Sequence, residues 1–291
     1  MIHKESLLLN ASTTDDEERL NRLKEYDAQQ GGVMLYRYRH LSDETPYEID
    51  ALRECKIWAS NPNCFDDKYE FLPTNISAKD YECVRFFCES QLNDLPAKER
   101  KRILAEIDRI YHSNGTAFLR FFINQLKISR AEFAVSCFTE NAPFDNNHNM
   151  WQQYAKNSGI CLGYSLSTLI KNRVIIDPVY YVDSKDKSLG KMFEQFGKGI
   201  RTALCFCIKE TYGVDQFAHD SDVICWRDQR EWRYAIPNTL DKSTNQYSNG
   251  CYLERRIVPD VVYVKNLKFK LRNQVWRTAR MNGIPVKRIK I

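Results

Sequence analysis

The stretch WRDQREWRY, residues 226–234, places two tryptophans, three arginines and two acids in nine positions. Its second half alternates as a β-strand does, in which successive side chains point to opposite faces. Glu231 and Arg233 therefore share one face, and Trp232 and Tyr234 share the other. Two interpretations are open at this point: an edge strand with a polar outer face, or a strand that carries a functional carboxylate.

The rest of the chain repeats this strand pattern between stretches of helical periodicity. Strands are predicted at residues 33–40, 56–60, 133–140, 160–165, 179–182, 231–236, 261–264 and 286–291. Helices are predicted at residues 15–30, 150–156, 191–213 and 271–283, with a short one near residues 51–55. This mixture, without an internal repeat, predicts an α+β fold with a mixed or largely antiparallel central sheet and helices packed on it.

One long segment, from about Ser77 to Leu126, has helical periodicity and no strand pattern. Its apolar residues form two helical stripes, from Ile103 to Tyr111 and from Phe118 to Leu126. We therefore predict a helical insertion at about 77–127 within a single domain that spans residues 33–291. An N-terminal helical leader over residues 1–32 precedes this domain.

The composition is that of a globular protein, with 43% hydrophobic residues, 28% charged residues and a formal net charge of +5. This charge is too small to argue for a nucleic-acid partner. No apolar run reaches membrane-spanning length, and the leucines at 7–9 are too few for a signal peptide, so we expect a cytoplasmic protein without membrane contact. The ten cysteines are then expected to be reduced thiols, and without a CxxC pair they predict no structural zinc.

Polar and aromatic residues gather in four clusters at or next to predicted strand ends. The clusters are Arg37, Arg39 and His40; Ser60, Asn61, Asp66, Asp67 and Glu70; Trp151 and Tyr154; and Glu231 with Arg233. Each has a purely structural interpretation, as solvated arginines, acids that build a turn, or aromatics that pack in the core. Strand ends and their loops are also where a sheet scaffold holds a functional site.

Two kinds of chemistry fit these clusters. An arginine pair can bind a pyrophosphate, an aromatic ring can stack on a nicotinamide, and a glutamate can polarise a ribose hydroxyl, which together suit an enzyme acting on NAD. Alternatively, Asp66, Asp67, Glu70, Asp228 and Glu231 could gather magnesium for a metal-dependent nuclease. A third interpretation is a non-catalytic binding or regulatory module. The fingerprints of P-loop, Rossmann, zincin and α/β-hydrolase enzymes do not occur in the sequence.

Four motifs resemble, in their order, the bacterial family called domain of unknown function 2971. They are LYRYRHL (35–41), WASNPNCFDDKYEF (58–71), SCFTE with NMWQQYAKNSGICLGYS (136–140 and 149–165), and W-x-x-x-x-EWR (226–233). The resemblance spans roughly residues 34–264 and implies a fold more directly than an activity. One motif departs from the family, whose loop usually reads Phe-Asn-Asp-Pro-Phe-Glu where this chain has FDDKYE (65–70), so the geometry of this loop does not follow from the resemblance.

The motif order is also similar to that of the ADP-ribosyltransferase superfamily, in which a first-strand His or Arg binds NAD, a Tyr or Ser follows, and a later strand supplies a catalytic Glu. This resemblance implies that Glu231 stabilises the oxocarbenium-like state, with Arg233 keeping it ionised and oriented. Residues implied to bind or flank NAD are Arg37, Arg39, Ser60, Trp151, Tyr154 and Arg233, with Asp66, Asp67 and Glu70 as loop contributors. Trp226 and Trp232 are expected to wall the strand on its other side.

The leading hypothesis is therefore an NAD-consuming, ADP-ribosyltransferase-like enzyme, acting as a bacterial toxin or antiphage defence effector. NAD is its expected substrate and no metal is favoured. Its acceptor is expected to be a macromolecule, either protein or nucleic acid. We expect the insertion at about 77–127 to contact that partner, because it interrupts the sheet and carries none of the four motifs.

Overall fold

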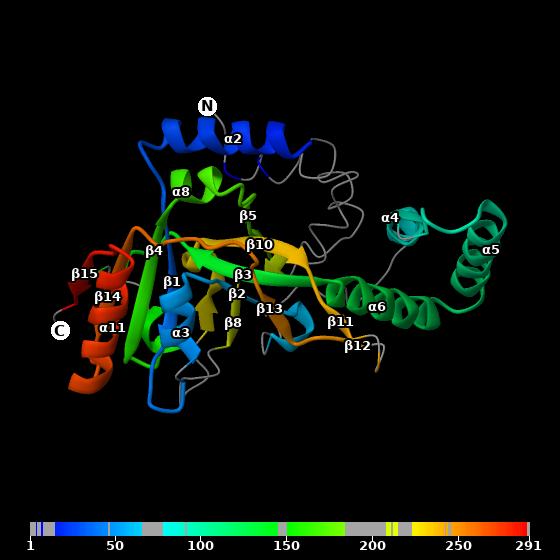
Figure 1. Cartoon of the computed structure of the whole chain (residues 1–291). Helices are drawn as coiled ribbons and strands as arrows, with labels where there is room; N and C mark the ends of the chain where they lie inside the picture. The colour runs from blue at the N-terminus through cyan, green and yellow to red at the C-terminus, as the bar shows by residue number, and fades with distance from the viewer. Residues whose placement is uncertain are drawn as a thin grey trace.

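The computed structural model describes Lys4, Leu7 and residues 15–45, 47–65, 78–90, 92–144, 150–183, 208–210, 212–214, 223–241, 243 and 246–289. It has the predicted α+β fold, in which helices pack on a mixed, mostly antiparallel sheet (Figure 1). The predicted helical insertion is present and projects from one end of the sheet. In the part of the chain that the structure describes, no helix is long and apolar enough to cross a membrane.

Within these residues the main sheet has nine strands, in the order β13-β2-β3-β1-β4-β14-β15, with β10 paired to β3 and β5 paired to β10. Their bounds are β1 (Met34–His40), β2 (Trp58–Ser60), β3 (Phe133–Thr139), β4 (Gly159–Ser165), β5 (Asp177–Pro178), β10 (Glu231–Pro237), β13 (Gly250–Tyr252), β14 (Val261–Lys265) and β15 (Val286–Arg288). The pairing is antiparallel except between β14 and β15.

Further short strands form two-stranded sheets. They are β6 (Tyr180–Val182) with β7 (Ile208–Glu210), β8 (Tyr212–Val214) with β9 (Val223–Cys225), and β11 (Leu240–Asp241) with β12 (Gln246–Tyr247). The β6 and β7 pair is parallel. It matters for the site described below, because β7 carries a lysine into that site.

The main sheet forks beside β3. Along one edge β3 pairs with β10 over its whole length, and β1 likewise pairs with β4 over its whole length. Between β1 and β3 the register contains the single pair Tyr36↔Thr139, and β2 joins the same edge of β3 further along, at Ser60↔Val135. The strands β1 and β2 therefore leave β3 at different points. Where β1 and β2 separate from β3, side chains from several strands can line one cavity.

The helices cover the sheet unequally. They are α2 (Asp16–Gln29), α3 (Tyr47–Glu54), α4 (Ala78–Ser90), α5 (Ala97–Ser113), α6 (Gly115–Ala131), α7 (Met150–Ala155), α8 (Leu166–Lys171) and α11 (Phe269–Met281), with 3-10 turns η1 (Pro62–Cys64) and η5 (Trp226–Gln229). On one face, α2 and α8 pack over β10 and β4, and α3 with α11 pack over β4 and β14. On the opposite face α7 packs against β1, β4 and β14. Further along this second face α4, α5 and α6 pack against Val135 of β3, and the cavity described below is bordered by residues of both clusters.

Most predicted elements agree with the structure to within a few residues, and two differ. The helix predicted over residues 191–213 is wrong at its end, because Ile208 lies in β7; residues 191–207 fall outside the described part of the chain. Strand pairing with β6 decides the conformation there, which helical periodicity does not take into account. The insertion is also longer than predicted, since α6 continues to Ala131 and leads directly into β3.

Candidate functional site

A cavity of about 330 Å³ lies at the fork of the sheet. The strands β1, β2, β3, β7 and β10 contribute to its wall, together with α7 and η5. Its lining, within the described residues, consists of Tyr36, Arg37, Tyr38, Arg39, Trp58, Ser60, Phe65, Val135, Cys137, Phe138, Thr139, Met150, Gln153, Tyr154, Lys209, Trp226, Gln229, Glu231 and Arg233. The volume is within the range of small-molecule sites, which are concave and apolar with a few placed polar groups.

Glu231 points into this cavity because of its position on β10. The strand alternates as predicted, so Glu231 and Arg233 face the cavity, while Trp232 is fully buried on the other face. There Trp232 packs against Tyr26 of α2, with ring centroids 5.7 Å apart. The residue before the strand, Arg230, has a φ of 46°, in the left-handed region. This turn ends η5 and starts β10 within a single residue.

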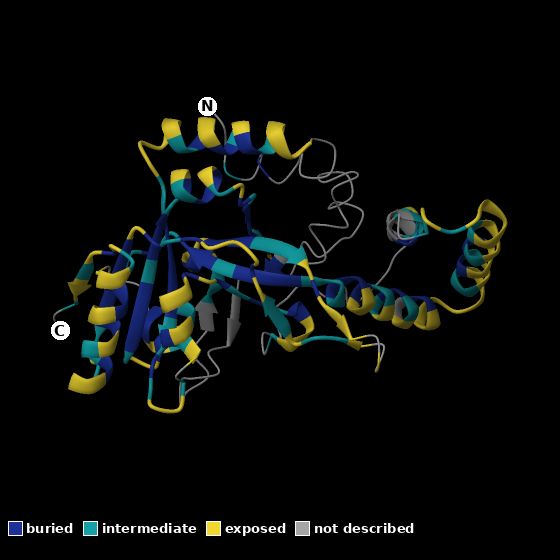
Figure 2. Cartoon of the chain, viewed as in Figure 1, coloured by how far each residue is buried: buried dark blue, intermediate teal, exposed yellow. Residues whose placement is uncertain are grey.

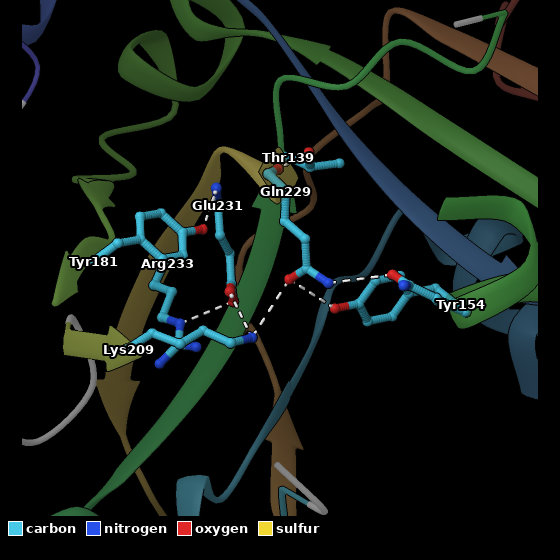
Figure 3. Close-up of polar contacts among 8 residues, drawn as sticks. Thr139, Tyr154, Tyr181, Lys209, Gln229, Glu231 and Arg233 are labelled. Atoms are coloured by element: carbon cyan, nitrogen blue, oxygen red, sulfur yellow. Dashed lines mark hydrogen bonds and ion pairs between the residues drawn. The ribbon is translucent and has the colours of Figure 1, made fainter. Parts of the chain in front are cut away.

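Two buried cations flank the Glu231 carboxylate (Figure 3). Its Oε1 accepts a hydrogen bond from Arg233 Nε at 2.8 Å, and its Oε2 lies 3.4 Å from Lys209 Nζ. Arg233 and Lys209 are 1% and 2% exposed. Burial by itself raises the pKa of Glu231, but the two cations more than offset it and lower the pKa from 4.5 to about 2. The carboxylate is therefore ionised throughout the neutral range.

A second network joins η5 to the other side of the cavity (Figure 3). The side-chain oxygen of Gln229 accepts hydrogen bonds from the Tyr154 hydroxyl at 3.1 Å and from Lys209 Nζ at 3.4 Å. Its amide nitrogen donates to Gln153 at 3.2 Å. The Thr139 hydroxyl donates to the backbone carbonyl of Gln229, which ties the end of β3 to η5. Lys209 therefore connects Gln229 with Glu231.

Arg37 is buried at the fork instead of being solvated. Its Nη2 donates to the carbonyl of Trp58 at 2.9 Å, and its guanidinium carbon lies 5.1 Å from the centroid of the Phe138 ring. The other terminal nitrogen, Nη1, has no hydrogen-bond partner among the described residues. Burial and the nearby Arg39 lower the pKa of Arg37 to about 9. Arg39 is more exposed and lies 3.8 Å from Glu48 of α3.

Of the other predicted site residues, Ser60 and Tyr154 lie at the cavity and Trp151 lies in the core. Ser60 lines the cavity and accepts a hydrogen bond from the Trp58 indole at 2.9 Å. Tyr154 is 43% exposed at the cavity, but its neighbour Trp151 is buried beneath α7, where it donates to the Pro143 carbonyl and packs edge-on against Tyr38. Trp151 therefore belongs to the core. Its ring cannot flank a ligand in this cavity.

One expectation about the tryptophans is wrong. Trp232 lies on the far side of β10, as predicted, but Trp226 lies on the cavity side with Glu231. The 3-10 turn η5 breaks the strand alternation before Arg230, so the two tryptophans do not share a face. Trp226 packs instead beneath Lys209, whose Nζ lies 4.4 Å from its ring centroid.

Sequence reasoning missed Lys209 and Gln229. The segment that contains Lys209 was predicted as helix, and its contact with Glu231 spans 22 residues of chain. Gln229 lies within WRDQREWRY, but it is uncharged and was therefore not considered as a site residue. A partial signal for Lys209 was the run IKETYGV, in which Ile208, Tyr212 and Val214 would share one face of a strand with Lys209 on the other, although Glu210 interrupts the apolar face.

The acids proposed for a metal site are not brought together in the described part of the chain. Asp66, Asp67 and Glu70 lie outside it, and Asp228 is exposed on η5. No group of three His, Cys, Asp or Glu side chains there is placed to hold a metal ion. Both carboxylate oxygens of Glu231 already contact cations, so a metal ion at Glu231 would have to compete with Arg233 and Lys209.

The chain was compared with models of protein families, with curated proteins and with solved structures, and none of them matches. The resemblance of its motifs to the family called domain of unknown function 2971, and to the ADP-ribosyltransferase superfamily, therefore stays a prediction.

Proposed function

We propose that the protein is an NAD-consuming, ADP-ribosyltransferase-like enzyme with Glu231 as its catalytic carboxylate. The observation that carries the proposal is the position of Glu231: a buried, ionised carboxylate at the wall of a cavity, held by Arg233 and Lys209. A carboxylate fixed in this way can stabilise positive charge that develops in a transition state.

The charge of the cavity supports an anionic substrate. The described lining contains four cationic side chains and one carboxylate, which leaves an excess of positive charge. Arg37 and Arg39 lie on β1, and Arg37 keeps a terminal nitrogen without a partner among the described residues. A pyrophosphate binds well to guanidinium groups, because the hydrogen bonds are charge-assisted and in some geometries paired. We assign the β1 side of the cavity to the pyrophosphate of NAD.

Aromatic side chains in the cavity can bind the rings of NAD. The cavity is bordered by Tyr36 of β1, Trp58 of β2, Phe65 next to η1, Tyr154 of α7 and Trp226 of η5. A nicotinamide or adenine ring can stack on such side chains, which present large, rigid apolar faces. Tyr154 is suited to this role, because its hydroxyl is held by Gln229 while its ring remains partly exposed.

In the proposed reaction the bond between the nicotinamide nitrogen and C1′ of the ribose breaks. Its electron pair goes to the nicotinamide, which leaves as a neutral molecule. The ribose then carries oxocarbenium character, which the Glu231 carboxylate stabilises through a hydrogen bond from a ribose hydroxyl. An acceptor nucleophile attacks C1′ and releases its proton to solvent. Arg233 and Lys209 act as positioning residues, since they keep Glu231 ionised and aimed into the cavity.

The test is release of nicotinamide from NAD by purified wild-type protein, with and without cell lysate as a source of acceptors. Glu231→Gln keeps the shape of the side chain and removes its charge, so we expect nicotinamide release to fall at least about 100-fold. Glu254→Gln serves as the matched control, because Glu254 is exposed and lies outside the cavity. Circular dichroism of all three proteins establishes that each is folded.

Two outcomes would contradict the proposal. If the wild-type protein leaves NAD intact even with lysate, the enzyme does not consume NAD. If Glu231→Gln and wild type release nicotinamide equally, Glu231 is not the catalytic carboxylate. Stoichiometric magnesium binding that is lost in Asp67→Ala would favour the metal-dependent nuclease instead.

A further inference from the structure

The end of the chain is strongly basic. Residues 265–291 contain nine of the 43 lysines and arginines and none of the 38 acids, so residues 1–264 hold 34 basic and 38 acidic residues. The net positive charge of the protein is therefore confined to its last 27 residues. A small overall charge hides this asymmetry, which matters for a partner that contacts one surface.

Helix α11 carries much of this charge on its outer side. Its inner side packs Leu271, Val275 and Ala279 into the core against β14. Figure 2 shows its outer side exposed, at the end of the molecule away from the helical insertion. Large apolar side chains are exposed there as well: Phe269 by 70%, Trp276 by 47% and Met281 by 76%.

Arginines and aromatic rings alternate along this outer side. Phe269, Arg272, Trp276 and Arg280 follow one another at spacings of three, four and four residues, which places them in one row along the helix. The guanidinium carbon of Arg272 lies 5.5 Å from the centroid of the Phe269 ring. Arg277 stands beside the row. We call these five residues the α11 ridge.

The arginines of the α11 ridge have no acidic partner in the part of the chain that the structure describes. The ion pair seen at this helix joins Lys268, before its first turn, to Asp43 at 3.9 Å. Arginines that hold a fold together usually face carboxylates, as Arg19 does with Asp177 at 2.7 Å. A row of arginines without acids, interleaved with exposed rings, is instead suited to a polyanion that also offers flat rings.

We propose that the α11 ridge binds single-stranded nucleic acid, with Arg272, Arg277 and Arg280 on its phosphates and Trp276 and Phe269 stacked on its bases. Such proteins combine cations along the backbone with aromatic side chains, on which bases of any sequence can stack. This inference concerns a surface outside the cavity and does not depend on the proposed function.

A membrane surface fits the same ridge less well. An interfacial helix buries a continuous apolar face in the lipid. In α11 that face is occupied by the protein core, and the exposed rings of Phe269 and Trp276 are separated along the row by Arg272. A nucleic acid needs no continuous apolar face, because each stacked base requires one ring with cations nearby.

The test is binding of a fluorescein-labelled 20-nucleotide poly(dT) or poly(U) strand to the full chain, measured by fluorescence anisotropy from 50 to 300 mM salt. The triple variant R272Q/R277Q/R280Q should bind at least tenfold more weakly. Its slope of log affinity against log salt should be shallower by about 2, since each phosphate contact on a single strand contributes about 0.7. Trp276→Ala should weaken binding by roughly tenfold without changing the slope.

The matched control is K98Q/K101Q/R102Q on α5, which removes the same charge from another exposed helix. We expect its affinity to remain within twofold of wild type. Equal losses in both triple variants would overturn the proposal, because the attraction would then be due to overall charge. A 20-base-pair duplex bound as tightly as the single strand, with no effect of Trp276→Ala, would also overturn it.

Phosphatidylserine vesicles provide the competing outcome. Co-sedimentation of the protein with these vesicles, together with no binding to either oligonucleotide at 50 mM salt, would assign the ridge to a membrane and refute the nucleic-acid proposal. Circular dichroism of each variant tests its folding, because Trp276, Arg277 and Arg280 are exposed but Arg272 is half-buried.

Discussion

The Glu231→Gln variant is expected to change how the stability of the protein depends on pH. The pKa of Glu231 is lowered from 4.5 to about 2 in the folded protein, and a tenfold change in an acid dissociation constant corresponds to about 1.4 kcal/mol. The ionised carboxylate therefore contributes about 3 kcal/mol to the free energy of unfolding at neutral pH. Because the folded pKa is the lower one, this contribution is complete well above pH 4.5 and is lost as the pH falls from 4.5 towards 2.

Urea denaturation of wild type and Glu231→Gln, followed by far-UV circular dichroism at pH 7, 5, 4 and 3, measures this contribution. Glutamine does not titrate, so the pH dependence that Glu231 contributes is absent from the variant. The difference in unfolding free energy between the two proteins should therefore shrink by about 2 kcal/mol between pH 7 and pH 3. Other acids titrate in both proteins, so their effects cancel in the difference.

Parallel pH curves for the two proteins would refute the reasoning, because they would mean that Glu231 does not hold a lowered pKa. Glu254→Gln is the control variant in this experiment, because it removes one carboxylate at an exposed position outside the cavity. In a protein that already carries Lys209→Met, Glu231→Gln is compared with the same change in wild type. A smaller loss of unfolding free energy in the Lys209→Met protein would show that Lys209 contributes to the lowered pKa of Glu231, because contacting charges are coupled.

Three further changes test the packing around the site. Gly159→Ala should lower the free energy of unfolding in urea by at least about 3 kcal/mol, because the added Cβ would clash with the backbone carbonyl oxygen of Arg39 in β1. Gly115→Ala adds a Cβ with nothing within 4 Å and should be nearly neutral, so equal effects of the two variants would contradict this account. Trp232→Ala should cost about 3–5 kcal/mol through the cavity it leaves, and a loss below about 1 kcal/mol in the same assay would show that α2 does not depend on it. Thr139→Val removes a hydroxyl bonded to both η5 and Asn141; calorimetry should report a loss of about 2 kcal/mol, and an unchanged melting temperature would exclude a role in holding η5.

The local conformation of most segments follows from the amino-acid sequence alone. Alternation in EWRYAI predicted a strand with Glu231 and Arg233 on one face, and the structure has both facing the cavity. Helical periodicity was also sufficient for the insertion and for the helix predicted at residues 15–30, which the structure has as α2 (Asp16–Gln29). Local patterns suffice in these cases because backbone geometry relates side chains a few residues apart directly to the faces of a helix or strand.

Tertiary structure decided which of these faces meet. The fork beside β3 depends on where β1 and β2 pair with β3, which no local pattern specifies. It buries Arg37, for which the sequence left open a solvated position or a position that binds NAD. Lys209 lies next to Glu231 because β7 pairs with β6. Trp151 packs in the core beneath α7. Contacts between distant segments follow from burial summed over the whole domain, so side chains of the same type and spacing can end in a cavity or in a core.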